Sequence, residues 1–130
     1  MRSFTLIEII VTVIIIGILA ALGLATYGGY KENALDKEAQ VNLRLIIAAE
    51  RIYRIEAGAY GAAPDNTTLN DSFRLLLPMT SPNWNYKATV GGASPTCAQA
   101  TRNSASNVRY WRMRITEDDP KNTAGNNTCP

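Results

Sequence analysis

One carboxylate, Glu8, interrupts an otherwise apolar run over Phe4–Ala25. An ionised side chain at a bilayer centre costs about 2.5–3.5 kcal/mol on insertion scales, so a carboxylate in such a segment marks a functional site by default. A cationic partner for Glu8 is therefore expected. The alternative is a carboxylate that snorkels to the headgroups, because Glu8 lies close to the start of the run.

The rest of the chain offers little chemistry for catalysis. It contains no His, the side chain used most often as general base or metal ligand near neutral pH. A small oxygen-rich group is a weak candidate for Ca²⁺, but it lacks EF-hand spacing and a solvated turn explains it better. The group comprises Glu117, Asp118, Asp119 and Asn122. We therefore expect no enzymatic activity and no cofactor, and no metal beyond this weak candidate.

Two cysteines, Cys97 and Cys129, lie in the C-terminal half without the spacing of a zinc site. A disulfide between them would close a loop of roughly 33 residues and contribute roughly 3–4 kcal/mol on the chain-entropy model. It would also place this half in an oxidising compartment. Two unpaired, buried thiols are the alternative.

Charge is nearly balanced, with 13 Lys and Arg against 11 Asp and Glu. The basic residues are scattered along the chain, so no specific nucleic-acid partner is predicted. Arg109, Arg112 and Arg114 share one predicted strand, where a solvated face is a simpler explanation than contact with DNA.

The apolar run is long enough to cross a membrane, since roughly 22 residues at about 1.5 Å each span roughly 33 Å as a helix. Arg2 precedes it, and by the positive-inside tendency this end stays cytoplasmic while the C-terminal part lies outside. A cleavable signal peptide is the rival interpretation, although its apolar core is usually about 7–15 residues and follows a clearly basic region.

Helical periodicity continues past the run to about Ala57, and Gly58 is the predicted end. Apolar residues at steps of three, four and seven predict the face that packs on a domain. They are Tyr27, Tyr30, Ala34, Val41, Leu45, Ala48, Ile52 and Ile55. The opposite side carries charged residues, Glu50 among them, and is expected to face solvent. Gly17 and Gly23 each weaken the helix by up to about 1 kcal/mol.

Residues 58–130 are expected to complete a small globular domain, called the head below. Residues 58–82 indicate an αβ loop with a helical turn at Asn70–Leu77. Alternation predicts strands at Asn83–Val90 and Val108–Thr116, the latter with Trp111, Met113 and Ile115 on one side. A weaker strand is expected around Cys97–Thr101. Glu117–Pro130 is expected to be a surface loop. The fold class is therefore α+β: a long N-terminal helix packed by its C-terminal half on a small antiparallel sheet.

The segment FTLIEIIVTVIIIGILAALGLATYGGY resembles the class III N-terminus of type IV pilins and the related type II secretion pseudopilins. Six residues in the family's spacing carry the resemblance: Phe4, Thr5, Leu6, Ile7, Glu8 and Gly17. The chain departs from the family at Ser3, where Gly is usual, and at Ala25, where many members have a helix-kinking proline. Beyond the first thirty or so residues, only the predicted order of elements resembles the family: a helix, an αβ loop, an antiparallel sheet and a C-terminal region bracketed by two cysteines.

The resemblance implies three parts: a leader at 1–3, a transmembrane and filament-core helix at 4–27, and a head at 28–130 with its sheet and disulfide-bounded tail from 83. A prepilin peptidase would cut between Ser3 and Phe4, and Phe4 would then be N-methylated. The freed amino group of one subunit is the expected partner of Glu8 in the next. Thr5, Gly17 and Gly23 complete the predicted assembly residues.

The implied function is that of a structural subunit that polymerises with its own copies into an extracellular type IV pilus-like filament. Its partners would be the inner membrane before assembly, the prepilin peptidase and the pilus assembly machinery. The alternative is a type II secretion pseudopilin in a short periplasmic filament. A hypothesis of another class is a secreted or lipid-anchored binding module whose apolar run is only a signal or anchor.

Overall fold

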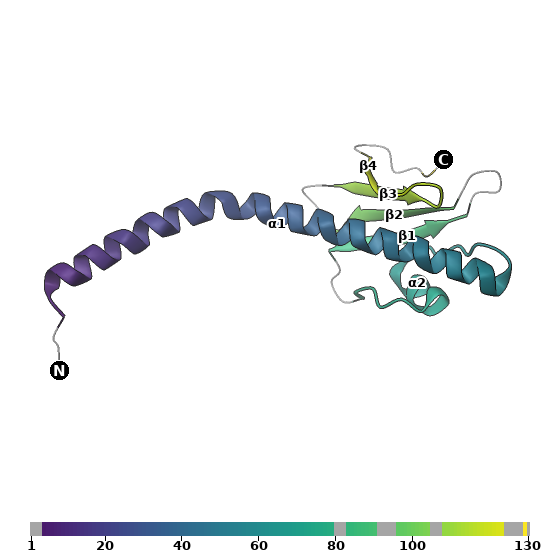
Figure 1. The fold of residues 1–130 in the computed structure, drawn as a ribbon, viewed down its shortest axis with the longest axis horizontal. Coiled ribbons are helices and arrows are strands. Elements are labelled where there is room, and N and C mark those ends of the chain that lie inside the picture. Colours follow the sequence, from purple (N-terminus) through teal and green to yellow (C-terminus); the bar gives the residue numbers. More distant parts are fainter. Residues whose placement is uncertain (1–3, 80–82, 91–95, 105–107, 124–128, 130) are drawn as a thin grey trace. The chain divides into compact units, whose positions relative to one another are not determined.

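A computed structural model describes residues 4–79, 83–90, 96–104, 108–123 and 129, without the side chains of residues 24–26 (Figure 1). The elements are helices α1 (Leu6–Ala57) and α2 (Asn66–Phe73) and strands β1 (Trp84–Thr89), β2 (Cys97–Arg102), β3 (Tyr110–Arg114) and β4 (Lys121–Asn122). The chain forms two compact units, Met1–Leu35 and Asp36–Pro130, and α1 contributes to both. The predicted α+β class is confirmed.

The sheet is antiparallel throughout, with strand order β1-β2-β3-β4. The first three strands lie where they were predicted. β4 was not predicted, because a polar strand of two residues has no pattern of its own and forms only by pairing with β3. The expectation of a tail without secondary structure is therefore wrong at Lys121–Asn122.

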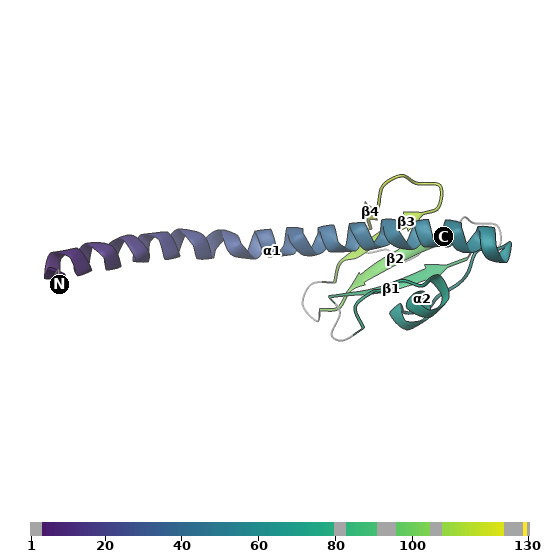
Figure 2. The same ribbon diagram turned by 60° about the horizontal axis from the view of Figure 1, so that its bottom comes forward.

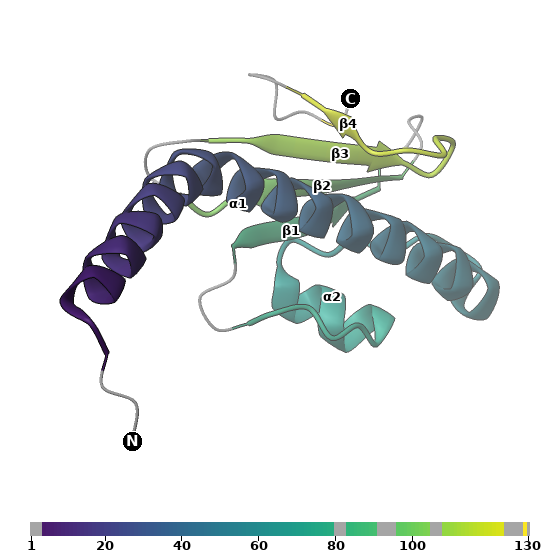
Figure 3. The same cartoon turned by 60° about the vertical axis from the view of Figure 1, so that its left-hand side comes forward.

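Within the second unit, the part of α1 after Asp36 packs on one face of the sheet, and α2 lies beside β1 (Figures 2 and 3). Trp84 and Tyr86 from β1 are buried at the centre of this core. The Asn42 amide of α1 donates a hydrogen bond to the Tyr86 hydroxyl at 2.8 Å. Burial raises the pKa of Tyr86 to about 12, so this phenol stays protonated near neutral pH.

The face of α1 that packs on the sheet is not the predicted one. Residues of α1 with at most 1% exposure are Ala39, Leu43, Ile46, Ile47 and Glu50. The predicted stripe lies on the other side, where Leu45 is 46% exposed and Ile55 is 84% exposed. Leu43 and Leu45 are two residues apart, or about 200° at roughly 100° per residue. Both stripes are periodic, so periodicity alone did not decide which one meets the sheet.

Glu50 was expected to face solvent and is instead fully buried. Its Oε2 accepts a hydrogen bond from the Gly61 backbone N at 3.1 Å, which ties the start of the αβ loop to α1. Its Oε1 has no hydrogen-bond partner among the described residues. Burial raises the pKa of Glu50, and the bond from Gly61 only partly opposes this.

The helix of the αβ loop begins four residues earlier than predicted, at Asn66. Asp65 caps it, because its Oδ1 accepts hydrogen bonds from the Thr68 N at 2.8 Å and the Thr68 hydroxyl at 2.9 Å. The helix ends where Arg74 adopts the left-handed conformation, with φ of 55°, and not at Pro78. The Asn66 amide donates to the carbonyls of Pro78 and Trp84 and accepts from Tyr86 N, so it fixes the loop to β1.

Two alanine substitutions test which stripe of α1 is buried. We expect Ile46→Ala to lower the free energy of unfolding by about 2–5 kcal/mol, because it opens a cavity in the core. Ile55→Ala, its matched control on the exposed stripe, should change it by no more than about 0.5 kcal/mol. Urea titration of the full chain in detergent measures both. Equal losses from the two variants would contradict the assignment.

A pH series tests the burial of Glu50. Because its pKa is raised in the folded chain, its contribution favours folding below its unfolded pKa and is lost as pH rises through the folded value. Glu50→Gln keeps an acceptor for Gly61 N but cannot ionise, so this loss should disappear while the stability at low pH changes little. The prediction would be wrong if the free energy of unfolding changed with pH in the same way for Glu50→Gln and for the natural chain between the unfolded and folded pKa values of Glu50.

Candidate functional site

Thr5 and Glu8 form a reciprocal hydrogen-bonded pair at the start of α1. The Glu8 Oε2 accepts from the Thr5 backbone N and from the Thr5 hydroxyl, both at 3.2 Å. The Thr5 hydroxyl in turn accepts from the Glu8 backbone N at 3.4 Å. This is a capping box, in which two helix-start donors are satisfied by side chains.

The capping role of these residues was not predicted, although the Thr-x-x-Glu spacing before an apolar run is its sequence signature. It gives Glu8 a function inside its own chain that requires no cationic partner. The capping contacts engage Oε2, and a carboxylate has lone pairs for about four hydrogen bonds. Glu8 therefore retains acceptor capacity for a donor from another molecule.

The side chains around Thr5 and Glu8 are exposed to solvent. All residues from Phe4 to Gly23 are exposed, and Leu6–Gly23 is long and apolar enough to cross a membrane, with a mean hydropathy of 2.8. A helix that is apolar all round is stable in lipid or in the core of a larger assembly. The length and composition of the segment are consistent with a membrane anchor.

Gly17 and Gly23 lie within an uninterrupted helix, which also continues through Ala25. A Cβ at either glycine would meet no atom within 4 Å. No packing among the described residues thus requires glycine there. Their small size is available for close approach of another helix.

A second apolar surface is left uncovered on the part of α1 in the head. Its exposed members are Val41 at 59%, Leu45 at 46%, Ile52 at 59% and Ile55 at 84%. Beside it, a groove of about 330 Å³ lies between α1 and α2 and is lined in part by Tyr53, Phe73 and Leu75. The exposed stripe lies opposite the residues of α1 that the sheet covers, and the groove borders the core at Phe73 and Leu75.

The disulfide between Cys97 and Cys129 is present, with 6.0 Å between the two Cα atoms. It tethers the tail to the first residue of β2. Both cysteines of the chain are used in it, so the alternative of two unpaired thiols does not hold.

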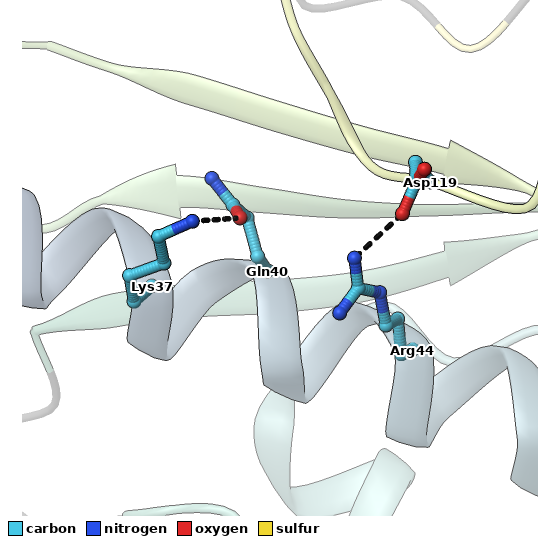
Figure 4. A network of polar contacts seen from close by, with 4 residues as sticks. All are labelled: Lys37, Gln40, Arg44 and Asp119. Carbon is cyan, nitrogen blue, oxygen red and sulfur yellow. Dashed lines mark hydrogen bonds and ion pairs between the residues drawn. The ribbon is translucent and has the colours of Figure 1, made fainter.

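Two of the four proposed calcium ligands, Asp119 and Glu117, form ion pairs with basic side chains of their own chain. Asp119 pairs with Arg44 of α1 at 2.6 Å, next to a contact between Lys37 and Gln40 (Figure 4). Glu117 pairs with Lys121 at 2.9 Å. In the described part of the chain, no group of three or more acidic, His or Cys side chains is arranged to hold a metal ion.

The leader residue Ser3 lies outside the described residues, whereas Phe4 precedes the helix and is 75% exposed. A long N-terminal helix followed by a small antiparallel four-stranded sheet is the architecture of the pilin fold.

Comparison with known proteins gives the same class. The chain is 36% identical over 59 residues to the type IV major pilin protein PilA of Myxococcus xanthus (strain DK1622). The match covers 45% of this chain and 27% of that protein, so it spans about a quarter of the relative. No family model and no solved structure matches. The resemblance to type IV pilins is thus confirmed by a relative of known class.

Proposed function

We propose that this chain is a non-enzymatic structural subunit that polymerises with its own copies into a type IV pilus-like filament. The observation that carries the proposal is the uncovered apolar surface of α1. The segment Leu6–Gly23 has 0% of its residues buried, and the head leaves a second apolar stripe bare. Lipid covers only the first in a membrane-bound monomer, whereas a bundle of copies covers both.

Glu8 sets the axial register in this proposal. The α-amino group freed by cleavage before Phe4 is the cation that a buried carboxylate in an apolar bundle needs. Removing one partner of such a pair costs about 3–5 kcal/mol. A subunit whose Glu8 meets the neighbour's N-terminus is therefore held at one height in the helical array, with Thr5 keeping the carboxylate at the helix start.

Processing and location follow the same logic. The precursor lies in the inner membrane with Arg2 on the cytoplasmic side, a prepilin peptidase removes residues 1–3, and Phe4 is N-methylated. The assembly machinery then extracts the helix into a filament outside the cell. The Cys97–Cys129 disulfide supports a head that folds in an oxidising compartment.

The second candidate is a type II secretion pseudopilin, built on the same plan but forming a short periplasmic filament for protein export. Calcium-dependent melting would favour it. Pairing of Asp119 with Arg44 and of Glu117 with Lys121 favours the pilus subunit, because both carboxylates already have cationic partners.

Mass spectrometry of the mature chain tests the class. We expect removal of Met1–Ser3 and one added methyl group on Phe4. The same protein from cells without prepilin peptidase should retain Met1–Ser3 and lack the methyl group. A mature N-terminus within or after the apolar run would identify a cleaved signal peptide and overturn the proposal.

Two substitutions at Glu8 separate the charge from the cap. Glu8→Gln preserves the capping box, which accepts Gln at this position, and removes the charge. Glu8→Leu removes both. If the charge pair sets register, both variants should insert in the membrane yet assemble about 100-fold less well or worse, as expected from the loss of about 3–5 kcal/mol.

Electron microscopy of sheared surface material, with immunoblots of the membrane fraction, measures assembly and insertion. Normal filaments from Glu8→Gln but not from Glu8→Leu would show that capping is the whole role of the residue. Normal filaments from both would remove Glu8 from the assembly mechanism.

A further inference from the structure

The groove between α1 and α2 has a wall that the fold holds in place. Tyr53 and Phe73 line it as an edge-to-face pair, with 5.2 Å between their ring centroids. Gly61 packs directly against both rings, since a Cβ there would lie 2.9 Å from Phe73 Cε1 and 3.0 Å from Tyr53 Cε1. The Gly61 N in turn donates to the buried Glu50. The groove is therefore preformed and does not depend on a ligand for its shape.

An apolar side chain protrudes beside this groove. Leu75 lines the groove and Leu77 is buried, whereas Leu76 between them is 97% exposed. This is the highest exposure of a large apolar side chain in the part of the chain that the structure describes. The groove volume of about 330 Å³ exceeds the volume of a leucine side chain. One copy of the chain thus carries both an apolar cavity and, next to it, a side chain that such a cavity could hold.

The groove also carries one charge of each sign. Glu56, in the last turn of α1, and Arg74, directly after α2, both line it and are exposed. Neither side chain forms a hydrogen bond or an ion pair with another described residue. The undescribed segments of the head contain no charged side chain. Both charges are therefore available to another molecule.

The backbone at Arg74 supports a use for its side chain. Arg74 adopts the left-handed conformation, with φ of 55° and ψ of 39°. Glycine is the usual residue at such a helix end, because a Cβ is strained in this conformation. Strain of this kind is concentrated at ligand-binding sites. An arginine here brings a guanidinium that can match a carboxylate with two parallel hydrogen bonds.

We propose that two copies of the chain pair through this surface about a two-fold axis. Leu76 of each copy enters the groove of the other, and Arg74 of each copy meets Glu56 of the other. A two-fold contact needs a self-complementary surface, because every contact occurs twice with the partners exchanged. The groove, the adjacent leucine and the two opposite charges meet that requirement within one surface of the head.

Another kind of partner fits the surface less well. A foreign apolar helix could fill the groove, but it would have to supply both counter-charges and a separate cavity for Leu76. A second copy supplies all three.

The pair is distinct from a filament contact. A two-fold contact closes after two copies, whereas a filament needs a contact that repeats in one direction. Leu45 and Ile52 line the groove and also belong to the exposed stripe that a bundle of copies covers in the proposed function. The pair and the filament would therefore compete for these residues, which makes the pair a resting form of the unpolymerised chain. Only this role rests on the proposed function.

Sedimentation velocity of the full chain in detergent, over a dilution series, measures the dissociation constant of the pair. We expect an equilibrium between monomer and dimer. Leu76→Asp should raise the dissociation constant roughly 100-fold or more, because each dimer loses two buried leucines. Met79→Asp is the matched control, since Met79 is also exposed but does not line the groove, and it should change the constant less than about twofold.

An exchange of charges tests the ion pairs. Glu56→Arg and Arg74→Glu each place two pairs of like charges in the dimer, so each should raise the dissociation constant roughly fivefold or more. The double variant Glu56→Arg/Arg74→Glu restores opposite charges in both contacts. It should return the constant to within about twofold of the natural value, which a merely misfolded single variant would not do.

Three results would overturn the proposal. The first is a chain that stays monomeric up to about 100 μM, where even a weak pair forms. The second is a dimer that survives Leu76→Asp, which would assign the contact to the apolar segment Leu6–Gly23. The third is loss in the single charge variants without recovery in the double variant. None of them affects the proposed function, which the N-terminus and the Glu8 variants decide.

Discussion

The structure depends on one constraint: α1 carries more apolar surface than its own chain can cover. In the head, the sheet buries the stripe that contains Leu43, Ile46 and Ile47 and leaves the stripe on the other side of the helix bare. In the first unit no described side chain before residue 24 is buried. A helix with this composition is stable only with lipid or further protein around it. Membrane insertion and self-assembly are two solutions to the same physical problem.

Polar contacts then decide how the sheet sits on α1. Asp36 accepts from the Arg109 guanidinium at 2.6 Å and from the Trp111 indole at 3.3 Å, and Asn42 donates to Tyr86. These contacts are directional, whereas burial of Ile46 and Ile47 alone would allow the sheet to slide. They also turn Trp111 toward the helix, and alternation along β3 consequently places Arg112 and Arg114 on the opposite face.

Local patterns were sufficient where one physical requirement dominates. The run Phe4–Ala25 was predicted as a membrane-grade helix because its composition alone excludes most other environments. β1 and β3 follow from alternation with period two, and Gly58 ends α1 with a φ of 77°, as a glycine at a helix end does. Thr5 and Glu8 carry a local signature of the same kind, the capping-box spacing, although their capping role was not predicted.

Tertiary structure decided which of two equally periodic stripes of α1 packs on the sheet. α1 has two periodic stripes, and only the position of the sheet shows that the one with Leu43 is inside and that Glu50 is buried with it. β4 exists only through cross-strand pairing, which places Lys121 opposite Arg112 of β3. The sequence determines the periodicity of each helix and strand. Packing determines which face of that helix or strand is buried, because burial and strand pairing depend on contacts between elements that are distant in the sequence.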